Sequence, residues 1–181
     1  MSAIAEADGD RISMSFDLNL MGNILLESGR VDEASSRFAR AVEVAGQADV
    51  PDEVKEAVRR NALFNEARVA LARNDVETAR ARAKAYAERV AATQVPFEVR
   101  QSHEIAGLVA LYAKDYALAV TELQQANQQD PRVLYNLALA HKGKGDAAMW
   151  RQVCQKAANF NGLGFNYSYV RAKALKMLAE G

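Results

Sequence analysis

A spacing pattern that recurs four times along the chain constrains its fold more than any other feature. It is clearest from Gly107 to Pro131, where a small residue is followed by a turn position seven residues later. A second small residue then comes twelve residues after the first, and an apolar residue sixteen after it. The copies begin at Gly22, Ala67, Gly107 and Ala138. Self-similarity at intervals of this length is typical of stacked helical hairpins.

The positions of this pattern have physical roles in a helical hairpin. A small residue at the first position lets the second helix cross close to the first. The turn position falls at Gly29, Asn74, Lys114 and Gly145. A turn there requires a left-handed backbone, which glycine adopts without strain and asparagine tolerates. At Lys114 the same conformation is expected to cost on the order of 1 kcal/mol.

Apolar periodicity and composition both predict an all-α chain. Only three prolines and few β-branched runs occur, and alanine is abundant. Helices are expected over about 15–28, 31–45, 51–73, 76–92, 96–113, 116–129, 131–144, 146–159 and 167–179. The stretch 51–73 is either one long helix or two that meet near Arg59. We favour one helix because no glycine or proline lies inside it.

The two ends of the chain are expected to differ. Residues 1–14 are predicted to be a disordered segment, since 1–11 is small and polar, and 15–181 is predicted to be one helical domain. The last helix carries Val170, Ala174, Leu175 and Leu178 at helical spacing. We expect it to cap the open apolar end of the stack.

Charge and hydropathy disfavour several classes of function. Lys plus Arg and Asp plus Glu are 23 each, so the basic surplus that nonspecific nucleic-acid binding needs is missing. No apolar run approaches the length of a transmembrane helix, and the first residues do not resemble a signal peptide. The single cysteine, Cys154, excludes an internal disulfide. These features fit a cytoplasmic protein, although a fragment of a secreted or anchored protein would share them.

Candidate catalytic and metal-binding residues are few. His103 and Glu104 begin a zinc-protease motif, but the second histidine would stand at position 107, which is glycine. His141 is the other histidine, and both are interpreted as packed side chains. Cys154 lies on an apolar stripe, where a buried inert thiol is favoured over a nucleophile. We therefore predict no catalytic residue, no metal site and no cofactor.

At the repeated positions the chain resembles the tetratricopeptide repeat (TPR) family, whose pattern is W-x2-L-G-x2-Y, then A-x3-F, then P. The third copy has His103, Ala106, Gly107, Ala110, Ala119, Leu123 and Pro131 at these positions. In the fourth copy, the run from Leu134 to Ala138 is a close match. The copies start 45, 40 and 31 residues apart, whereas the family period is about 34. The surplus in the first two intervals predicts longer helices or connections.

This resemblance implies a right-handed α-solenoid of about four hairpins plus the capping helix. In the family, the first helix of each hairpin lines a concave face that binds partners. The corresponding residues here are Phe16, Asn19, Asn23, Asn61, Phe64, Asn65, Arg68, Gln101, Glu104, Leu108, Arg132, Tyr135, Asn136 and Leu139. Some family members clamp a terminal carboxylate with cations, but Asn19, Gln101 and Ile105 stand at those positions. That ligand is therefore not predicted.

The leading functional hypothesis is a non-catalytic scaffold that binds a peptide or helix of a partner protein on this face. An asparagine amide offers both a donor and an acceptor, so it can pair with an extended peptide backbone. A second hypothesis is a small-molecule sensing or regulatory domain of a larger protein. A third is a structural oligomerisation unit. The chain itself is expected to be a monomer or a weak homo-oligomer, with no nucleic-acid or membrane partner.

Overall fold

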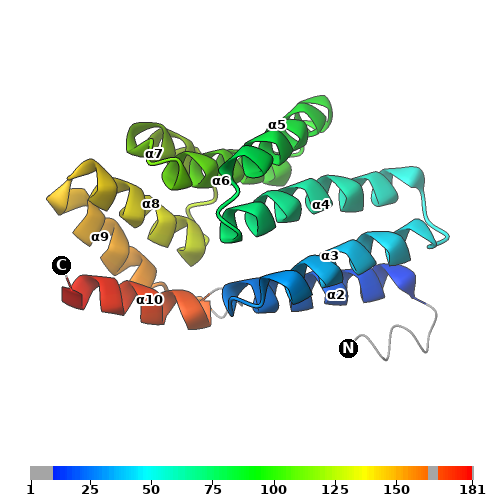
Figure 1. The fold of residues 1–181 in the computed structure, drawn as a ribbon, viewed down its shortest axis with the longest axis horizontal. Helices are drawn as coiled ribbons and strands as arrows, with labels where there is room; N and C mark the ends of the chain where they lie inside the picture. The colour runs from blue at the N-terminus through cyan, green and yellow to red at the C-terminus, as the bar shows by residue number, and fades with distance from the viewer. Residues whose placement is uncertain (1–9, 163–166, 181) are drawn as a thin grey trace. The chain divides into compact units, whose positions relative to one another are not determined.

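The computed structural model describes residues 10–162 and 167–180, and all regular secondary structure in these ranges is helical (Figure 1). The helices are α2 (Arg11–Glu27), α3 (Val31–Gly46), α4 (Asp52–Ala72), α5 (Val76–Thr93), α6 (Pro96–Tyr112), α7 (Tyr116–Gln125), α8 (Pro131–Lys144), α9 (Ala147–Ala158) and α10 (Tyr167–Glu180). This confirms the predicted all-α class for the described residues. Neighbouring helices pack together within each unit: α2 on α3 and α3 on α4 in the first, and each of α6 to α9 on the helix that follows it in the second. None of the described helices is both long and apolar enough to cross a membrane.

The chain divides into two compact units, Met1–Arg89 and Val90–Gly181. The first contains α2, α3, α4 and most of α5. The second contains the last turn of α5 and the helices from α6 to α10. Each unit is described by itself below.

Two helix boundaries differ from the predicted ones by four residues, for local reasons, and the others agree to within one residue. Helix α2 begins at Arg11 because the Asp10 carboxylate accepts hydrogen bonds from the backbone N–H groups of Ile12 and Ser13, at 3.1 and 2.9 Å. Residues 1–9 of the predicted disordered segment lie outside the described ranges. Helix α7 ends at Gln125 because Ala126 turns to an extended conformation. By contrast, 52–72 forms one uninterrupted helix, so the prediction of a single helix there is confirmed.

The four predicted turns adopt the same left-handed geometry, which confirms the expectation for Gly29, Asn74, Lys114 and Gly145. Their φ angles are 77°, 62°, 62° and 83°. In each turn the next residue donates its backbone N–H to a carbonyl five residues earlier, at 2.9–3.0 Å. The turn residue itself donates to a carbonyl three residues earlier. These two bonds define the Schellman motif that ends a helix and satisfies its last carbonyls.

Lys114 has the most strained backbone of the four turn residues. Its φ of 62° lies in the left-handed region, where the Cβ of a residue other than glycine is crowded by the backbone. We expect Lys114→Gly to raise the free energy of unfolding by up to about 1 kcal/mol. Its side chain is exposed, so little packing is lost. Urea denaturation measures the change, and Gly145→Ala, at φ 83°, is the reverse control that should destabilise. A destabilised Lys114→Gly variant would contradict the assigned strain.

Close helix crossing in the first unit depends on Gly22. A Cβ placed there would lie within 3 Å of three atoms of the Phe38 ring, so α2 and α3 touch where glycine stands. The Ser15 hydroxyl donates to the Ala41 carbonyl at 2.8 Å and ties the same two helices together. The buried Leu18 packs with Ala41 in the core between them. The small residue at the start of the first copy therefore has the packing role that the spacing predicted.

The second unit has one continuous core drawn from α6 to α10. Gly107 repeats the arrangement of Gly22, because a Cβ there would lie 2.6 Å from Leu123 Cγ and 3.1 Å from the Leu123 backbone nitrogen. Ala138 and Cys154, the matching pair in the last copy, are both fully buried. The sixteen-residue offset thus marks a pair of residues that share a helix crossing.

Helix α10 packs on α8 and α9, as expected for a terminal helix. The Cys154 thiol lies 3.4 Å from the Ala174 carbonyl, which joins α9 to α10. One prediction for this helix was wrong: Leu175 is 49% exposed. Val170 and Ala174 are buried as predicted, and Met177 is the third buried side chain. Their spacing of four and three residues selects a face of α10 that excludes Leu175.

Candidate functional site

Polar side chains of α2 and α4 face one another in the first unit. Asn19, Asn23 and Glu27 follow one another every fourth residue on α2, so they share one side of that helix. On α4, Asn65 follows Asn61 by four residues and Arg68 follows Asn65 by three, so these three also share one side. We call the four asparagines Asn19, Asn23, Asn61 and Asn65 the asparagine face. All four belong to the set predicted from the sequence.

Asn19 joins the two rows of the asparagine face. Its Nδ2 donates to the Ser15 carbonyl at 3.0 Å, which fixes the orientation of the amide. Its Oδ1 accepts from Asn65 Nδ2 at 3.0 Å and from Asn61 Nδ2 at 3.3 Å. Both lone pairs of this oxygen are therefore used. Asn19 holds the face together and has little capacity left as an acceptor for a ligand.

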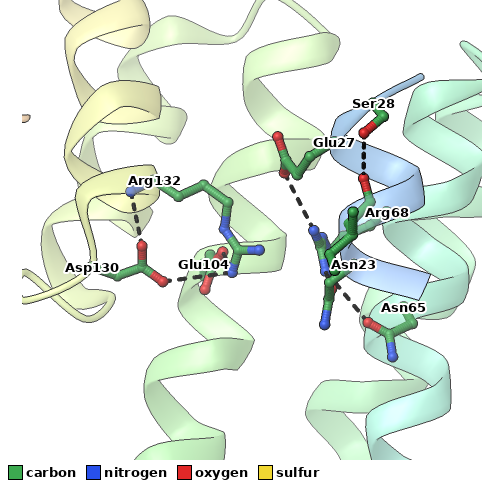
Figure 2. A network of polar contacts seen from close by, with 9 residues as sticks. Asn23, Glu27, Ser28, Asn65, Arg68, Glu104, Asp130 and Arg132 are labelled. Atoms are coloured by element: carbon green, nitrogen blue, oxygen red, sulfur yellow. Dashed lines mark hydrogen bonds and ion pairs between the residues drawn. The ribbon is translucent and has the colours of Figure 1, made fainter. Parts of the chain in front are cut away.

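Arg68 fixes the other end of the asparagine face (Figure 2). Its Nη1 donates to Asn23 Oδ1 at 2.5 Å and lies 3.5 Å from Asn65 Oδ1. Its Nη2 lies 3.5 Å from Glu27 Oε1. The residue is only 7% exposed, and a buried guanidinium needs such partners to offset its lost hydration. Arg68 thus fixes the amide oxygens of Asn23 and Asn65 in position.

Two groups on the asparagine face keep unused hydrogen-bonding capacity. Asn61 Oδ1 accepts no hydrogen bond from any described residue. Asn23 Nδ2 donates no hydrogen bond to any described residue. Both side chains are partly exposed. The face therefore presents one acceptor and one donor on opposing helices. Such a pair matches the N–H and C=O of an extended peptide backbone.

A second polar cluster lies within the second unit, around Arg132 (Figure 2). Arg132 Nη2 lies 2.7 Å from Glu104 Oε1 and 3.7 Å from Asp130 Oδ2. The first contact is an ion pair between two largely buried side chains, 15% and 4% exposed. Asp130 also accepts from the Arg132 backbone N–H at 2.8 Å and begins α8. Glu104 and Arg132 were predicted on the concave face, whereas Asp130 and Glu27 were missed.

The other predicted face residues differ widely in exposure. Phe16 is 66% exposed, whereas Phe64 and Leu108 are buried. Phe64 lies beneath the Arg68 guanidinium, 5.6 Å from ring centre to guanidinium carbon. The partly buried ones are Gln101, Tyr135, Asn136 and Leu139. Of the apolar members of the predicted face, Phe64 and Leu108 therefore lie in the core, whereas Tyr135 and Leu139 stay partly exposed.

The two histidines and the cysteine each contact a neighbouring segment of the fold. His103 Nδ1 lies 2.8 Å from Glu122 Oε2, which links α6 to α7. His141 is buried, with Nδ1 3.5 Å from Asp146 Oδ2. Burial raises the pKa of the Cys154 thiol, although nearby Lys142 opposes this. A raised pKa disfavours the nucleophilic thiolate. No group of three potential metal ligands occurs among the described residues.

The first unit also contains a cleft that the sequence did not reveal. It has a volume of about 230 Å³ and is formed by α3, α4 and the start of α5. Its lining combines a floor of apolar side chains with a charged rim. Small residues at Ala39, Ala62 and Ala70 leave the space. Ala39 lies on α3, and Ala62 and Ala70 lie on α4, so no spacing within one helix relates all three, and alanine is too common in this chain to mark a cleft.

No family model matches the sequence, and no curated protein matches it. The TPR resemblance thus has only the repeated residues of the sequence as its basis. What the protein binds is inferred from its own side chains.

Proposed function

We propose that this protein is a non-catalytic interaction module of the TPR type that binds an extended peptide segment of a partner protein. In this proposal its hairpins stack as a right-handed α-solenoid, and the asparagine face is the centre of the binding surface. The four equivalent turns support a repeated hairpin unit. The two close crossings, at Gly22 and Gly107, support it as well.

The observation that carries the proposal is the unused capacity at Asn23 and Asn61. Peptide backbones that lie against a protein surface need partners for their N–H and C=O groups. Asn61 Oδ1 suits a peptide N–H, and Asn23 Nδ2 suits a peptide C=O. Because Asn19 and Arg68 hold the neighbouring amides in place, the peptide meets a surface that is already ordered. Such preorganisation lowers the entropic cost of binding.

The test begins with selection of peptides from a random library displayed on phage. The affinity of the selected peptides is then measured by calorimetry for the wild type and for the double variant Asn23→Leu, Asn61→Leu. Loss of two hydrogen bonds should raise Kd by about tenfold or more. Gln124→Leu is the matched control, since it removes an exposed amide from α7 in the second unit. Circular dichroism confirms that each variant remains folded.

The proposal fails if the double variant binds the selected peptides as tightly as the wild type. It also fails if selection yields no peptide that binds the folded protein. A Gln124→Leu variant that weakens binding as much as the double variant would place the peptide elsewhere. That result would likewise contradict the role of the asparagine face.

A further inference from the structure

The cleft between α3, α4 and α5 combines apolar and charged lining residues, and none of them belongs to the asparagine face. Phe38 and Val69 form its deep part, and both are nearly inaccessible to solvent. Val42 and Ala62 form its walls and are partly exposed. The cleft therefore has an apolar interior that opens to solvent at a rim. All of these residues belong to the first unit.

The rim of the cleft carries both signs of charge. Arg73 and Arg82 are its cations, and Glu66 and Asp75 are its anions. Arg82 Nε lies 3.1 Å from Glu66 Oε2, with both side chains about half exposed. Arg73 pairs with Asp32, whose side chain is 92% exposed. Pairs this exposed are weak, so a ligand can exchange with them at little cost.

The volume of the cleft limits the size of its ligand. An apolar cavity of roughly 150 Å³ holds a benzene molecule, and drug-sized pockets begin at about 300 Å³. At about 230 Å³, the cleft lies between these limits. It therefore accommodates one aromatic ring or one branched aliphatic group with a short polar extension. The balanced rim favours an extension that carries both a positive and a negative charge.

We propose that this cleft binds a free apolar α-amino acid. The side chain of the ligand occupies the space against Phe38 and Val69. Its carboxylate contacts the arginines of the rim, and its ammonium group contacts Glu66 or Asp75. A hydroxyl on Ser35, which has no partner among the described residues, lines the same cleft and offers a further polar contact.

The first test uses L-phenylalanine as the probe, with the full-length protein in a calorimetric titration. Saturable binding with one site per chain is expected. Phenylacetate lacks the ammonium group and phenethylamine lacks the carboxylate, so each should bind about tenfold more weakly or worse. Absence of phenylalanine binding overturns the proposal. Equal affinity for all three compounds overturns the assignment of a zwitterionic ligand.

The second test uses variants that alter the cleft. Ala62→Leu fills its wall and should abolish binding, because Ala62 lies partly exposed at its side. The double variant Arg73→Gln, Arg82→Gln should bind phenylalanine about tenfold more weakly, whereas its affinity for phenethylamine should stay unchanged. Arg40→Gln, Arg80→Gln is the matched control, since both form exposed i,i+3 pairs away from the cleft. Thermal melting checks that each variant is folded.

The outcomes separate this site from the proposed peptide surface. Asn23→Leu, Asn61→Leu should bind phenylalanine as the wild type does, because these residues do not line the cleft. Full phenylalanine binding by a folded Ala62→Leu variant overturns the proposal. Equal weakening by the two double-arginine variants also overturns it, since the effect would then come from net charge alone.

Discussion

Removal of α10 by truncation after Gly162 is expected to lower the melting temperature of the second unit by about 10–20 °C and to cause aggregation. Val170 and Met177 are buried against α8 and α9, and each fully buried side chain of this kind contributes about 1.5–3 kcal/mol. Their loss alone is a large share of a typical stability of about 5–15 kcal/mol. The truncation also exposes the surface of α9 around Cys154.

Trp150 makes this experiment specific to the second unit. It is the single tryptophan and lies buried in the same core as α10, so its fluorescence follows the unfolding of that core. Light scattering measures aggregation in the same samples. Leu175→Ser is the matched control, because Leu175 is on α10 but half exposed, and the variant should melt close to the wild type. A truncated chain that stays monomeric with an unchanged melting temperature would show that α10 is not a structural cap.

Gly107→Val is expected to lower the free energy of unfolding by about 2–4 kcal/mol. A Cβ at this position would lie 2.6 Å from Leu123 Cγ, and Leu123 is fully buried, so its side chain has nowhere to move. The Leu123 backbone nitrogen, at 3.1 Å, prevents relief by a rotamer change alone. Helices α6 and α7 must therefore separate, and the core around their crossing loosens. Urea denaturation followed by Trp150 fluorescence measures the loss.

Gly46→Ala provides the control for this substitution. Gly46 is the last residue of α3, and no atom lies within 4 Å of the position that its Cβ would take. Alanine there should be neutral or stabilise by up to about 1 kcal/mol, because it restricts the unfolded chain. A Gly107→Val variant as stable as the wild type would mean that α6 and α7 do not require the close crossing.

Local features of the fold could be predicted from the sequence because they depend on residues near one another in the chain. The left-handed turn at Lys114 follows from its place in a repeated spacing, although lysine itself does not favour it. The single long helix over 52–72 follows from the absence of glycine and proline. The helix start at Arg11 does not follow from apolar periodicity, because its N-cap residue Asp10 lies in a small, polar stretch.

The candidate site could be predicted only in part. The family resemblance implied that Asn19, Asn23, Asn61 and Asn65 share one face. The structure joins Asn61 and Asn65 to Asn19 by hydrogen bonds, and Arg68 links Asn23 to Asn65. The resemblance did not show that Asn19 is saturated by its neighbours or that Arg68 is buried among them. Whether a polar side chain faces solvent or another side chain depends on how two helices pack. That packing involves residues more than forty positions apart.

By itself, the sequence determined which stretches are helical, where the four left-handed turns fall and where small residues permit close crossings, since these depend on backbone preferences and side-chain volume. The tertiary structure alone decided which side of each helix is covered. On α10 it buries Met177 and exposes Leu175, although both are apolar and two residues apart. In the first unit it leaves a cleft where Ala39, Ala62 and Ala70 meet. The physical reason is that burial and cavity shape arise from several helices packing together, whereas periodicity describes one helix at a time.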